Sequence, residues 1–525
     1  MTHPLAFTNI RLVDPASGYD GPGSVLITGG VIADVIRGGD PGALSPDAEV
    51  IDGQGALLIP GLVDIRVKTG EPGAEPKETL KSAAQAAAAG GVTTMVVQPD
   101  THPVMDEPAV IDFILRRARD IELVKVYPAG AATKGCEGQR MAEIGLMREA
   151  GCLYVTDADR PIVDSKVFRR VLAYAKAFGV LVAHRPSDPW LSGGAAASEG
   201  EFASRLGLPA SPAIAERIML ERDLALVELT GAPLIVDQLT TAAALESLKR
   251  GRDRGLPVTA TTSINHLSFN ELDIGDYRTF CKLDPPLRSE DDRQAVIEAV
   301  ASGLIQVIVS AHAPAPPEDK RLPYDEAAPG AVGLQTLLPA LLAFHHEGRI
   351  PLIDLIRCVT SAPAALLGLT SGRIAKGAPA DLVLCDLNAP VVIDAVASGL
   401  IQVIVSAHAP APAEDKRLPY DEAAPGAVGL QTLLAALLAF HHEGRIPLID
   451  LIRTVTSAPA SLLGLPAGRL AKGAPADLVL CDLNAPVVIQ ADQLISKSKN
   501  SPFDGRRLQG KVLRTVVDGR TVYVG

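Results

Sequence analysis

Two cationic residues stand at the end of an apolar segment and face the same side. Leu62–Val67 is an apolar, β-branched run that is typical of a buried strand. Alternate residues of a strand point to the same side, so Arg66 and Lys68 would lie together. A guanidinium stays protonated and has no lone pair to donate. The pair is therefore unsuited to a metal ion, and by charge alone it suits an anionic metabolite.

The composition limits what such a site could belong to. The chain has 525 residues, of which 47% are hydrophobic, enough for one large barrel with accessory domains. The net charge of −12 and the lack of a basic run make nucleic acid an unsuitable partner. Neither a signal peptide nor a membrane span is expected, because no charged segment precedes an apolar stretch and no apolar run reaches about 20 residues. Six scattered cysteines without a CxxC pair predict reduced thiols in a cytoplasmic protein.

Alternating strands and helices must position the cationic pair. Helical patterns separate the apolar runs at Lys77–Ala89, Ser165–Phe178 and Ala242–Arg254. Eight such strands with intervening helices predict an α/β fold, a (β/α)8 TIM-type barrel with a parallel sheet. The predicted strands are Leu62–Val67, Val92–Val97, Leu123–Tyr127, Leu153–Thr156, Val180–Ala183, Pro233–Leu239, Val258–Thr262 and Leu304–Val309.

Both ends of the chain have the pattern of short β-strands. The tail Gly510–Val524 predicts a hairpin with an Asp-Gly turn. We expect Ala380–Leu384 and its later copy Ala476–Leu480 to join the same sheet, giving a small β-sandwich-like domain built from both chain ends. The N-terminal candidates are Phe7–Val13, Ser24–Thr28 and Val31–Arg37.

A long repeat occupies the second half of the chain. Ala299–Ile393 recurs as Ala395–Ile489, and the offset is 96 residues. This identity is typical of a partial duplication or of an error in assembling the sequence, and removing one copy leaves 429 residues. The repeat adds a ninth candidate strand, Leu400–Val405, for which an eight-stranded barrel has no place. One copy must therefore pack outside, swap to another subunit or remain poorly ordered, and the pattern leaves open which copy closes the barrel. Seven of the 95 positions differ: Pro317/Ala413, Pro339/Ala435, Cys358/Thr454, Ala365/Ser461, Thr370/Pro466, Ser371/Ala467 and Ile374/Leu470.

These patterns predict five segments. Residues 1–58 begin the β-domain, residues 59–375 form the barrel with the first copy, and residues 376–394 add a β-domain strand. Residues 395–475 are the duplicated barrel segment, and residues 476–525 complete the β-domain.

Several short motifs, in this order and spacing, resemble those of the dihydroorotase branch of the amidohydrolase superfamily. The resemblance implies a barrel flanked by a β-domain. It also implies reversible hydrolysis of a cyclic amide, in which zinc activates water and an aspartate moves the proton. The motifs are Pro60–Asp64, Glu71-Pro72-Gly73, Lys77-Glu78-Thr79, Ala88–Thr94, Pro99–Val104, Pro285–Arg288, Ser310–Pro314 and Lys499–Gly505.

By the same resemblance, most of the family's site residues are replaced. Asp157 and His184 stand at metal-ligand positions as residual candidates, and two ligands do not make a closed zinc site. We expect His184 to be satisfied by local partners and Asp157 to pair with Arg66 or Lys68. At the other positions, Arg66 and Lys68 replace two metal histidines, and Gly70 replaces a substrate-binding arginine. Gln238 replaces a metal histidine, Ala311 (Ala407 in the copy) replaces the catalytic aspartate, and Ala315 replaces a histidine. Asp100 and Asp284 stand for substrate-contacting asparagines, Arg185-Pro186-Ser187 for the motif after the strand-5 histidine, and His312 is retained.

Three functions follow from this pattern. The first is a non-catalytic dihydroorotase-like protein of pyrimidine synthesis that has no cofactor and binds aspartate carbamoyltransferase, with self-association also possible. The second is an active zinc-dependent dihydroorotase with altered ligands. The third is a protein that binds an anionic metabolite at Arg66 and Lys68.

Overall fold

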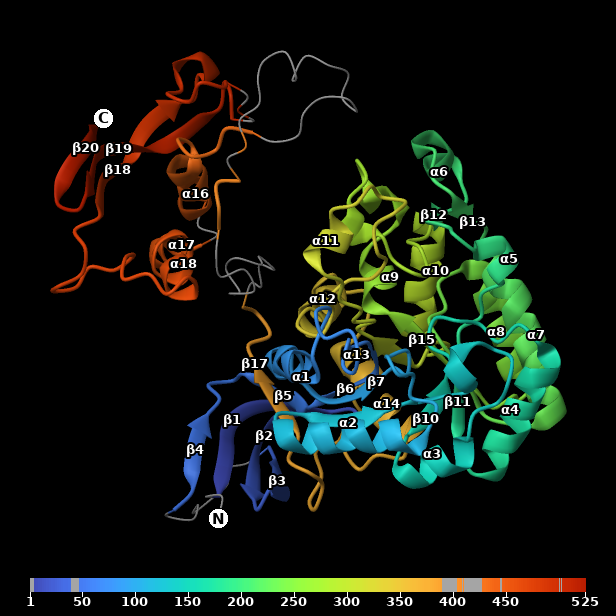
Figure 1. Cartoon of the computed structure of the whole chain (residues 1–525). Helices are drawn as coiled ribbons and strands as arrows, with labels where there is room; N and C mark the ends of the chain where they lie inside the picture. Colours follow the sequence, from blue (N-terminus) through green and yellow to red (C-terminus); the bar gives the residue numbers. More distant parts are fainter. Residues whose placement is uncertain are drawn as a thin grey trace. The chain divides into compact units, whose positions relative to one another are not determined.

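The computed structural model describes residues 4–38, 47–389, 404–407, 409, 427–443, 446–499, 501 and 503–525. The chain divides into two compact units, Met1–Ala389 and Pro390–Gly525 (Figure 1). Their boundary falls close to the end of the first repeat copy, and the five predicted segments remain a prediction. All six cysteines are free thiols. No helix in the described part of the chain has both the length and the apolarity to cross a bilayer.

Eight parallel strands form the centre of the first unit, and each predicted strand is present. The third predicted strand is broken at Ala129 into two short pieces, β8 and β9. We call these strands together the strand ring. They are β6 (Leu62–Val67), β7 (Val92–Val97), β8 (Lys125–Pro128), β9 (Gly130–Ala131), β10 (Tyr154–Thr156), β11 (Leu181–His184), β14 (Leu234–Val236), β15 (Val258–Ser263) and β16 (Val307–Val309).

Two seams interrupt the hydrogen bonding of the ring. One parallel sheet has the order β6-β7-β8, and the other has the order β9-β10-β11-β14-β15-β16. At the first seam the chain passes directly from β8 to β9, and at the second a single parallel bridge joins Val67 to His312. The α/β class with parallel strands is therefore confirmed, but the strands do not form one continuous ladder in the described residues.

The inside of the ring is filled with apolar side chains. Val63, Ile65, Val96 and Ile235 point inward and are fully buried. Ala364 of helix α14 (Ser361–Leu366) joins this cluster, and Leu366, Leu367 and Leu369 pack against it together with Leu153 and Leu181. Because the last two residues stand where strands begin, the first repeat copy closes the ring at the end opposite the strands' carboxyl ends.

Helices cover the outside of the ring, and their ends follow local capping signals (Figure 1). Thr79 caps α1 by accepting a hydrogen bond from the Ser82 N–H, so this helix begins three residues later than predicted. It ends before Gly91, whose φ of 77° suits a residue without a side chain. The main helices are α1 (Leu80–Ala89), α2 (Pro108–Ile121), α3 (Ile144–Ala150), α4 (Ser165–Ala177), α7 (Ile214–Thr230), α8 (Ala242–Asp253), α10 (Glu290–Ala301), α12 (Leu337–His346) and α13 (Leu352–Val359).

The N-terminal strands form a separate sheet in the first unit. Its order is β17-β5-β1-β2-β3, and β4 pairs with β1. Buried residues from β1, β2, β3 and β5 form its core, together with Ile374 from the first repeat copy. The strands are β1 (Leu5–Asp14), β2 (Tyr19–Thr28), β3 (Val31–Arg37), β4 (Glu49–Asp52), β5 (Leu57–Pro60) and β17 (Leu382–Cys385).

The second unit carries the second repeat copy and the tail. Helices α16 (Leu433–His442), α17 (Leu448–Val455) and α18 (Ser457–Leu462) precede the sheet β18-β19-β20. The predicted tail hairpin is confirmed, since Asp518 and Gly519 have the positive φ angles of a tight turn, 48° and 75°. Its strands are β18 (Leu478–Val488), β19 (Arg507–Val517) and β20 (Arg520–Val524).

The structure corrects one expectation about the repeat and answers the question of which copy closes the ring. The two copies of the β-domain strand do not share a sheet, because β17 pairs with β5 whereas β18 pairs with β19. The reason is that β17 already occupies the edge of β5, and β18 leads into β19 along the chain. The first copy closes the ring, because its strand β16 pairs with β15. The predicted ninth strand lies mostly outside the described residues, and Ile404 and Val405, which are described, are not in a strand.

Candidate functional site

A pocket of about 250 Å³ opens at the carboxyl ends of the strands, where this fold class places its active sites. Its wall comes from the loops that follow several strands of the ring. Most of the residues singled out in the sequence line it: Arg66, Lys68, Gly70, Asp100, Gln238, Asp284, Ala311 and Ala315.

Arg66 lies at the floor of this pocket and is almost fully buried. Its Nε donates to Asp237 Oδ2 at 2.6 Å, and its Nη2 donates to Asp159 Oδ1 at 2.5 Å. Burial alone would lower the pKa of this guanidinium, but the two carboxylates outweigh burial and raise the pKa above its ordinary value. Arg66 is therefore a permanent cation held by two carboxylates.

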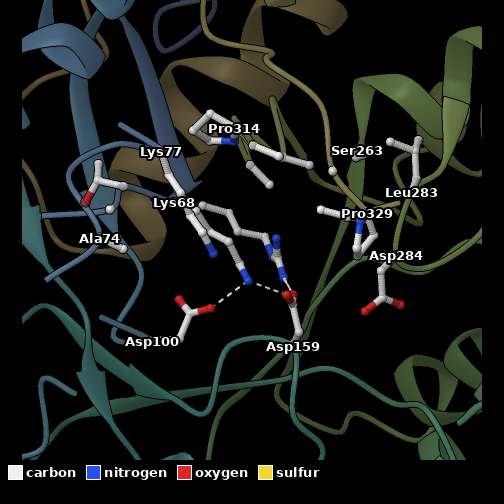
Figure 2. A pocket seen from close by; sticks show the side chains of 18 of the residues that line it. Lys68, Ala74, Lys77, Asp100, Asp159, Ser263, Leu283, Asp284, Pro314 and Pro329 are labelled. Atoms are coloured by element: carbon white, nitrogen blue, oxygen red, sulfur yellow. Dashed lines mark hydrogen bonds and ion pairs between the residues drawn. The ribbon is translucent and has the colours of Figure 1, made fainter. Parts of the chain in front are cut away.

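Lys68 lies between two carboxylates, as Figure 2 shows. Its Nζ donates to Asp100 Oδ2 at 2.6 Å and also forms an ion pair with Asp159. Burial would raise the pKa of Asp159, but Lys68, Arg66 and Arg185 together hold that pKa well below its usual range. Asp159 is thus an anion shared among three cations.

Arg185 extends the same cluster toward the other side of the pocket. Its guanidinium forms a two-pronged ion pair with Asp284, with Nη1 3.0 Å from Asp284 Oδ2. The same Nη1 lies 3.2 Å from Asp159 Oδ1. We call the resulting group the ion-pair network, and it contains three cations and four carboxylates. Its members are Arg66, Lys68, Arg185, Asp100, Asp159, Asp237 and Asp284.

Asp159 and Asp237 were not among the predicted site residues, and Arg185 was noted only as part of a replaced motif. Asp157 was expected to pair with Arg66 or Lys68, but the residue that does so is Asp159. Ala158 between them has a φ of 54°, and the chain turns there just after β10 ends. Asp237 and Arg185 each follow directly after a strand, β14 and β11. Their position at the carboxyl ends of neighbouring parallel strands is the signal that could have revealed them.

Asp157 and His184, the residual metal candidates, lie beneath the pocket and do not line it. Asp157 accepts hydrogen bonds from the Thr133 N–H at 2.8 Å and from the Thr133 hydroxyl, and burial raises its pKa. His184 Nε2 accepts from the Ile162 N–H at 2.8 Å, and its Nδ1 lies 2.6 Å from the Asp223 carboxylate. The bond from Ile162 uses the Nε2 lone pair that His184 would need to bind a metal ion.

The retained histidine, His312, also lies outside the pocket lining. Its Nδ1 accepts from the Gly333 N–H at 3.1 Å, and its Nε2 lies 3.4 Å from Glu78 Oε2. The arginine that the family resemblance implies at Gly70 has no room, because a Cβ there would lie 1.8 Å from the carbonyl oxygen of Ala74. The backbone has therefore closed around this glycine.

These residues do not fit a zinc ion. In the described part of the chain, no three His, Cys, Asp or Glu side chains are grouped so that they could hold a metal. The carboxylates that converge on the pocket already face Arg66 and Lys68, and a dication there would lie against two positive charges. Gln238 adds only an amide, whose buried Oε1 has no partner among the described residues, and Ala311 adds no proton acceptor.

Comparisons with known proteins cover almost the whole chain. A family model described as Dihydro-orotase-like matches residues 55–243, and one described as Amidohydrolase family matches residues 230–409 and 388–522. A dihydroorotase of Syntrophotalea carbinolica is 40% identical over 382 residues, which cover 73% of this chain and 89% of the relative. A dihydroorotase of Anaeromyxobacter dehalogenans is 40% identical over 396 residues, which cover 75% and 91%.

Solved structures share the fold at low identity. The L-hydantoinase of Arthrobacter aurescens matches with a TM-score of 0.63 at 19% identity, over 100% of this chain and 96% of its own. The dihydropyrimidinase of Brevibacillus agri matches with a TM-score of 0.62 at 18% identity, over 99% and 95%. Both likenesses concern the architecture alone.

Proposed function

Because the chain belongs to the dihydroorotase family, we propose that it keeps the family's fold but does not catalyse the zinc-dependent hydrolysis of a cyclic amide. The observation that carries this proposal is the pair of ion pairs that the buried Arg66 makes with Asp159 and Asp237. A buried charge that loses its partner is strongly destabilising, so these carboxylates are committed to the guanidinium. They are not free to bind a metal ion.

The chemistry expected of the family also lacks its other parts in this pocket. Zinc would polarise the amide carbonyl and activate water, and the described side chains of this pocket do not form a set of ligands that would hold it. Ala311 has no group that accepts or donates a proton, and Gly70 has no charge for a substrate carboxylate. Each absence removes a different contribution to the rate.

The role we propose is structural or regulatory, in pyrimidine synthesis, with aspartate carbamoyltransferase as the partner. The support is that the framework motifs persist while the site residues are replaced, which fits a protein kept for its surface. To test this, the chain is mixed with aspartate carbamoyltransferase from the same organism and examined by gel filtration with light scattering. We expect one larger complex and a change in transferase activity. Separate elution, with unchanged transferase activity, would contradict the role.

An active dihydroorotase is the second candidate, favoured by the named relatives at 40% identity. The test measures zinc content and dihydroorotate turnover on one preparation, with a metal-bearing dihydroorotase as the control. We expect less than about 0.1 zinc per chain and no turnover above the buffer rate. About one zinc per chain, with turnover abolished by His184→Ala, would establish the active enzyme instead.

Binding of an anionic metabolite is the weaker candidate, because both cations already face carboxylates. A thermal-shift titration with carbamoyl aspartate tests it. We expect no shift in the melting temperature. A saturable rise in wild type that is lost in Arg66→Ala would support an anion site.

A further inference from the structure

The two copies of the repeat adopt the same local structure. Helices α12, α13 and α14 of the first copy match α16, α17 and α18 of the second, each pair having the same length. The junction between the second and third helices is also the same, with φ/ψ of −132°/−87° at Thr360 and −128°/−88° at Thr456. The described helices of the second copy therefore repeat the local fold of their counterparts in the first copy.

The second copy keeps part of the inner packing of the first. Ile404, Leu437, Ile446 and Leu451 form a small cluster of their own. Their counterparts in the first copy, 96 residues earlier, all belong to the main core: Ile308, Leu341, Ile350 and Leu355. Every described member of this small cluster therefore belongs to the second copy.

The copies differ in whether their outer face is covered. Ile374 is 1% exposed, whereas its counterpart Leu470 is 86% exposed. Leu366 packs against the interior of the ring, whereas its counterpart Leu462 is 75% exposed. In the first copy α13 and α14 lie against β6, and α13 also lies against β16. The surface that fits this face is therefore known, because it covers the same residues in the first copy.

The few differences between the copies bear on whether the second copy would fit the same position against the ring. Three of the seven differences fall at sites that are buried in the first copy, Cys358/Thr454, Ser371/Ala467 and Ile374/Leu470, and the second of these only removes a hydroxyl. The Thr454 hydroxyl already donates to the Leu451 carbonyl at 2.7 Å, so it brings no unsatisfied polar group. Leucine and isoleucine have the same volume, and such exchanges are tolerated well in cores.

We propose that the two copies compete for this one position within a single chain, so that the protein has two alternative folded arrangements. In the first arrangement the first copy closes the ring, as described above. In the second arrangement the second copy closes it, and β18 takes the place of β17 beside β5. Both copies are tethered to the same ring, so exchange within a chain is favoured over exchange between chains by effective concentration.

The exchange changes the surface and leaves the pocket as it is. Both copies contain the sequence Ser-Ala-His-Ala-Pro-Ala that begins at Ser310 and at Ser406. Either copy therefore supplies the same residues to the pocket wall. What changes is the position of the tail hairpin. In the second arrangement β18 would pair with β5, so that the hairpin strands β19 and β20 would continue the N-terminal sheet. This device is independent of whether the pocket is catalytic.

One substitution can report both arrangements. Leu57 of β5 lies directly opposite Cys385 of β17, and the counterpart of Cys385 is Cys481; both cysteines are free. Opposed residues on antiparallel strands are close enough for a disulfide. In Leu57→Cys, the introduced thiol would bond to Cys385 in the first arrangement and to Cys481 in the second. Burial raises the pKa of Cys385 to about 11, so the oxidation is run at alkaline pH.

Peptide mapping of the oxidised Leu57→Cys protein distinguishes the outcomes. The two linked peptides differ because Asp394 follows one copy and Gln490 follows the other. We expect both disulfides to form. The Cys481 product should make up at least about a tenth of the total, because the two arrangements are close in free energy. Leu57→Cys with Cys385→Ser should give only the Cys481 product, and Leu57→Cys with Cys481→Ser should give only the Cys385 product.

Two results would overturn the proposal. The first is that Leu57→Cys with Cys385→Ser remains reduced, which would mean that the first copy never leaves its position. The second is that the Cys481 product forms only between chains, as seen by mixing isotopically light and heavy protein, which would mean that copies exchange between molecules.

Hydrogen exchange on the unmodified protein gives an independent measurement in case Leu57→Cys does not fold. Peptides of α13 and α17 have different masses because of Cys358 and Thr454. We expect each peptide to show a protected and an unprotected population, in complementary proportions. Uniform protection of α13 with uniform exchange of α17 would contradict the proposal.

Discussion

Two regions at opposite ends of the strand ring are closed by different kinds of contact. At the carboxyl ends, the ion-pair network joins Arg66, Lys68 and Arg185 to four carboxylates. At the other end, apolar residues around Ala364 and Leu369 of the first copy fill the ring, and Ile374 of the same copy packs in the core of the N-terminal sheet. The first region depends on specific charge partners, whereas the second depends on shape and apolar surface.

The difference matters because only one of the regions has a duplicate. Each carboxylate of the ion-pair network is encoded once, and the loss of Arg66 would leave the buried Asp237 without its ion-pair partner. The apolar face of the first copy is encoded twice, and its second version has the same local fold. We therefore expect the charged end to be sensitive to single substitutions and the apolar end to be buffered against them.

The largest effect is expected when both versions of the apolar face are changed. Ile374→Asp with Leu470→Asp should lower the free energy of unfolding by more than about 4 kcal/mol, because neither copy can then cover the N-terminal sheet without burying a carboxylate. Leu470→Asp alone should cost less than about 0.5 kcal/mol, as at an exposed site. Ile374→Asp alone should cost less than about 2 kcal/mol, because the second copy then takes its place. The measurement is urea unfolding of all three variants.

One result would contradict the expected protection by the second copy. If Ile374→Asp alone costs as much as the double substitution, the second copy gives no protection. The apolar end would then be as sensitive as the charged end.

The next largest effect is expected at the charged end. Arg66→Met should lower the free energy of unfolding by about 3–5 kcal/mol, because Asp237 loses its ion pair while it remains buried. The matched control is Arg66→Met with Asp237→Asn, which removes the stranded charge and should recover part of the loss. Urea unfolding checks both variants, and equal stability of wild type and Arg66→Met would show that the network does not hold this end together.

The two regions also differ in how far the sequence revealed them. The eight strands could be predicted because each is an apolar, β-branched run between helical patterns. Arg66 and Lys68 could be predicted to lie together because they stand two residues apart at the end of one of those runs. Asp100 was also singled out, but Asp159 and Asp237 were not, because ion pairs join residues far apart in the chain. Asp159 and Asp157 are separated by one alanine, and only the turn at Ala158 decides which of them meets Arg66.

The fate of the repeat was likewise beyond the sequence. Identical residues have identical propensities, so no pattern distinguishes the copy whose strand joins the ring from the copy whose strand joins the tail sheet. Tertiary contacts decide it: β16 lies next to β15, and β18 runs into β19. The sequence predicted the conflict between the copies, and the structure supplied one resolution of it.

The response to pH should separate the regions, because only one of them is charged. The pKa of Asp159 is lowered in the folded protein, so its contribution to stability is present above its ordinary value of 3.8 and is lost as the pH falls below that value. The pKa of Lys68 is raised, so its contribution is present below 10.5 and is lost as the pH rises through the higher folded value. Asp159→Asn should flatten the acid side of a stability curve measured by urea unfolding. An unchanged acid side would contradict this assignment.

The smallest effect on stability is expected from added or removed metal ions. This measurement tests whether Arg66 and Lys68 occupy the place of a metal ion. If Arg66 and Lys68 fill the place of a dication, the folded protein gains nothing from binding zinc, since only a ligand that prefers the folded state raises stability. A chelator or a tenfold excess of zinc should therefore change the melting temperature by less than about 1 °C. The double variant Arg66→His with Lys68→His is the informative comparison. It presents two imidazoles on one side of β6, beside Asp159 and Asp237. If zinc raises the melting temperature of that variant and not of wild type, the two cations are what excludes the metal; if zinc stabilises wild type as well, the charged end still binds metal and the contrast between the two regions is lost.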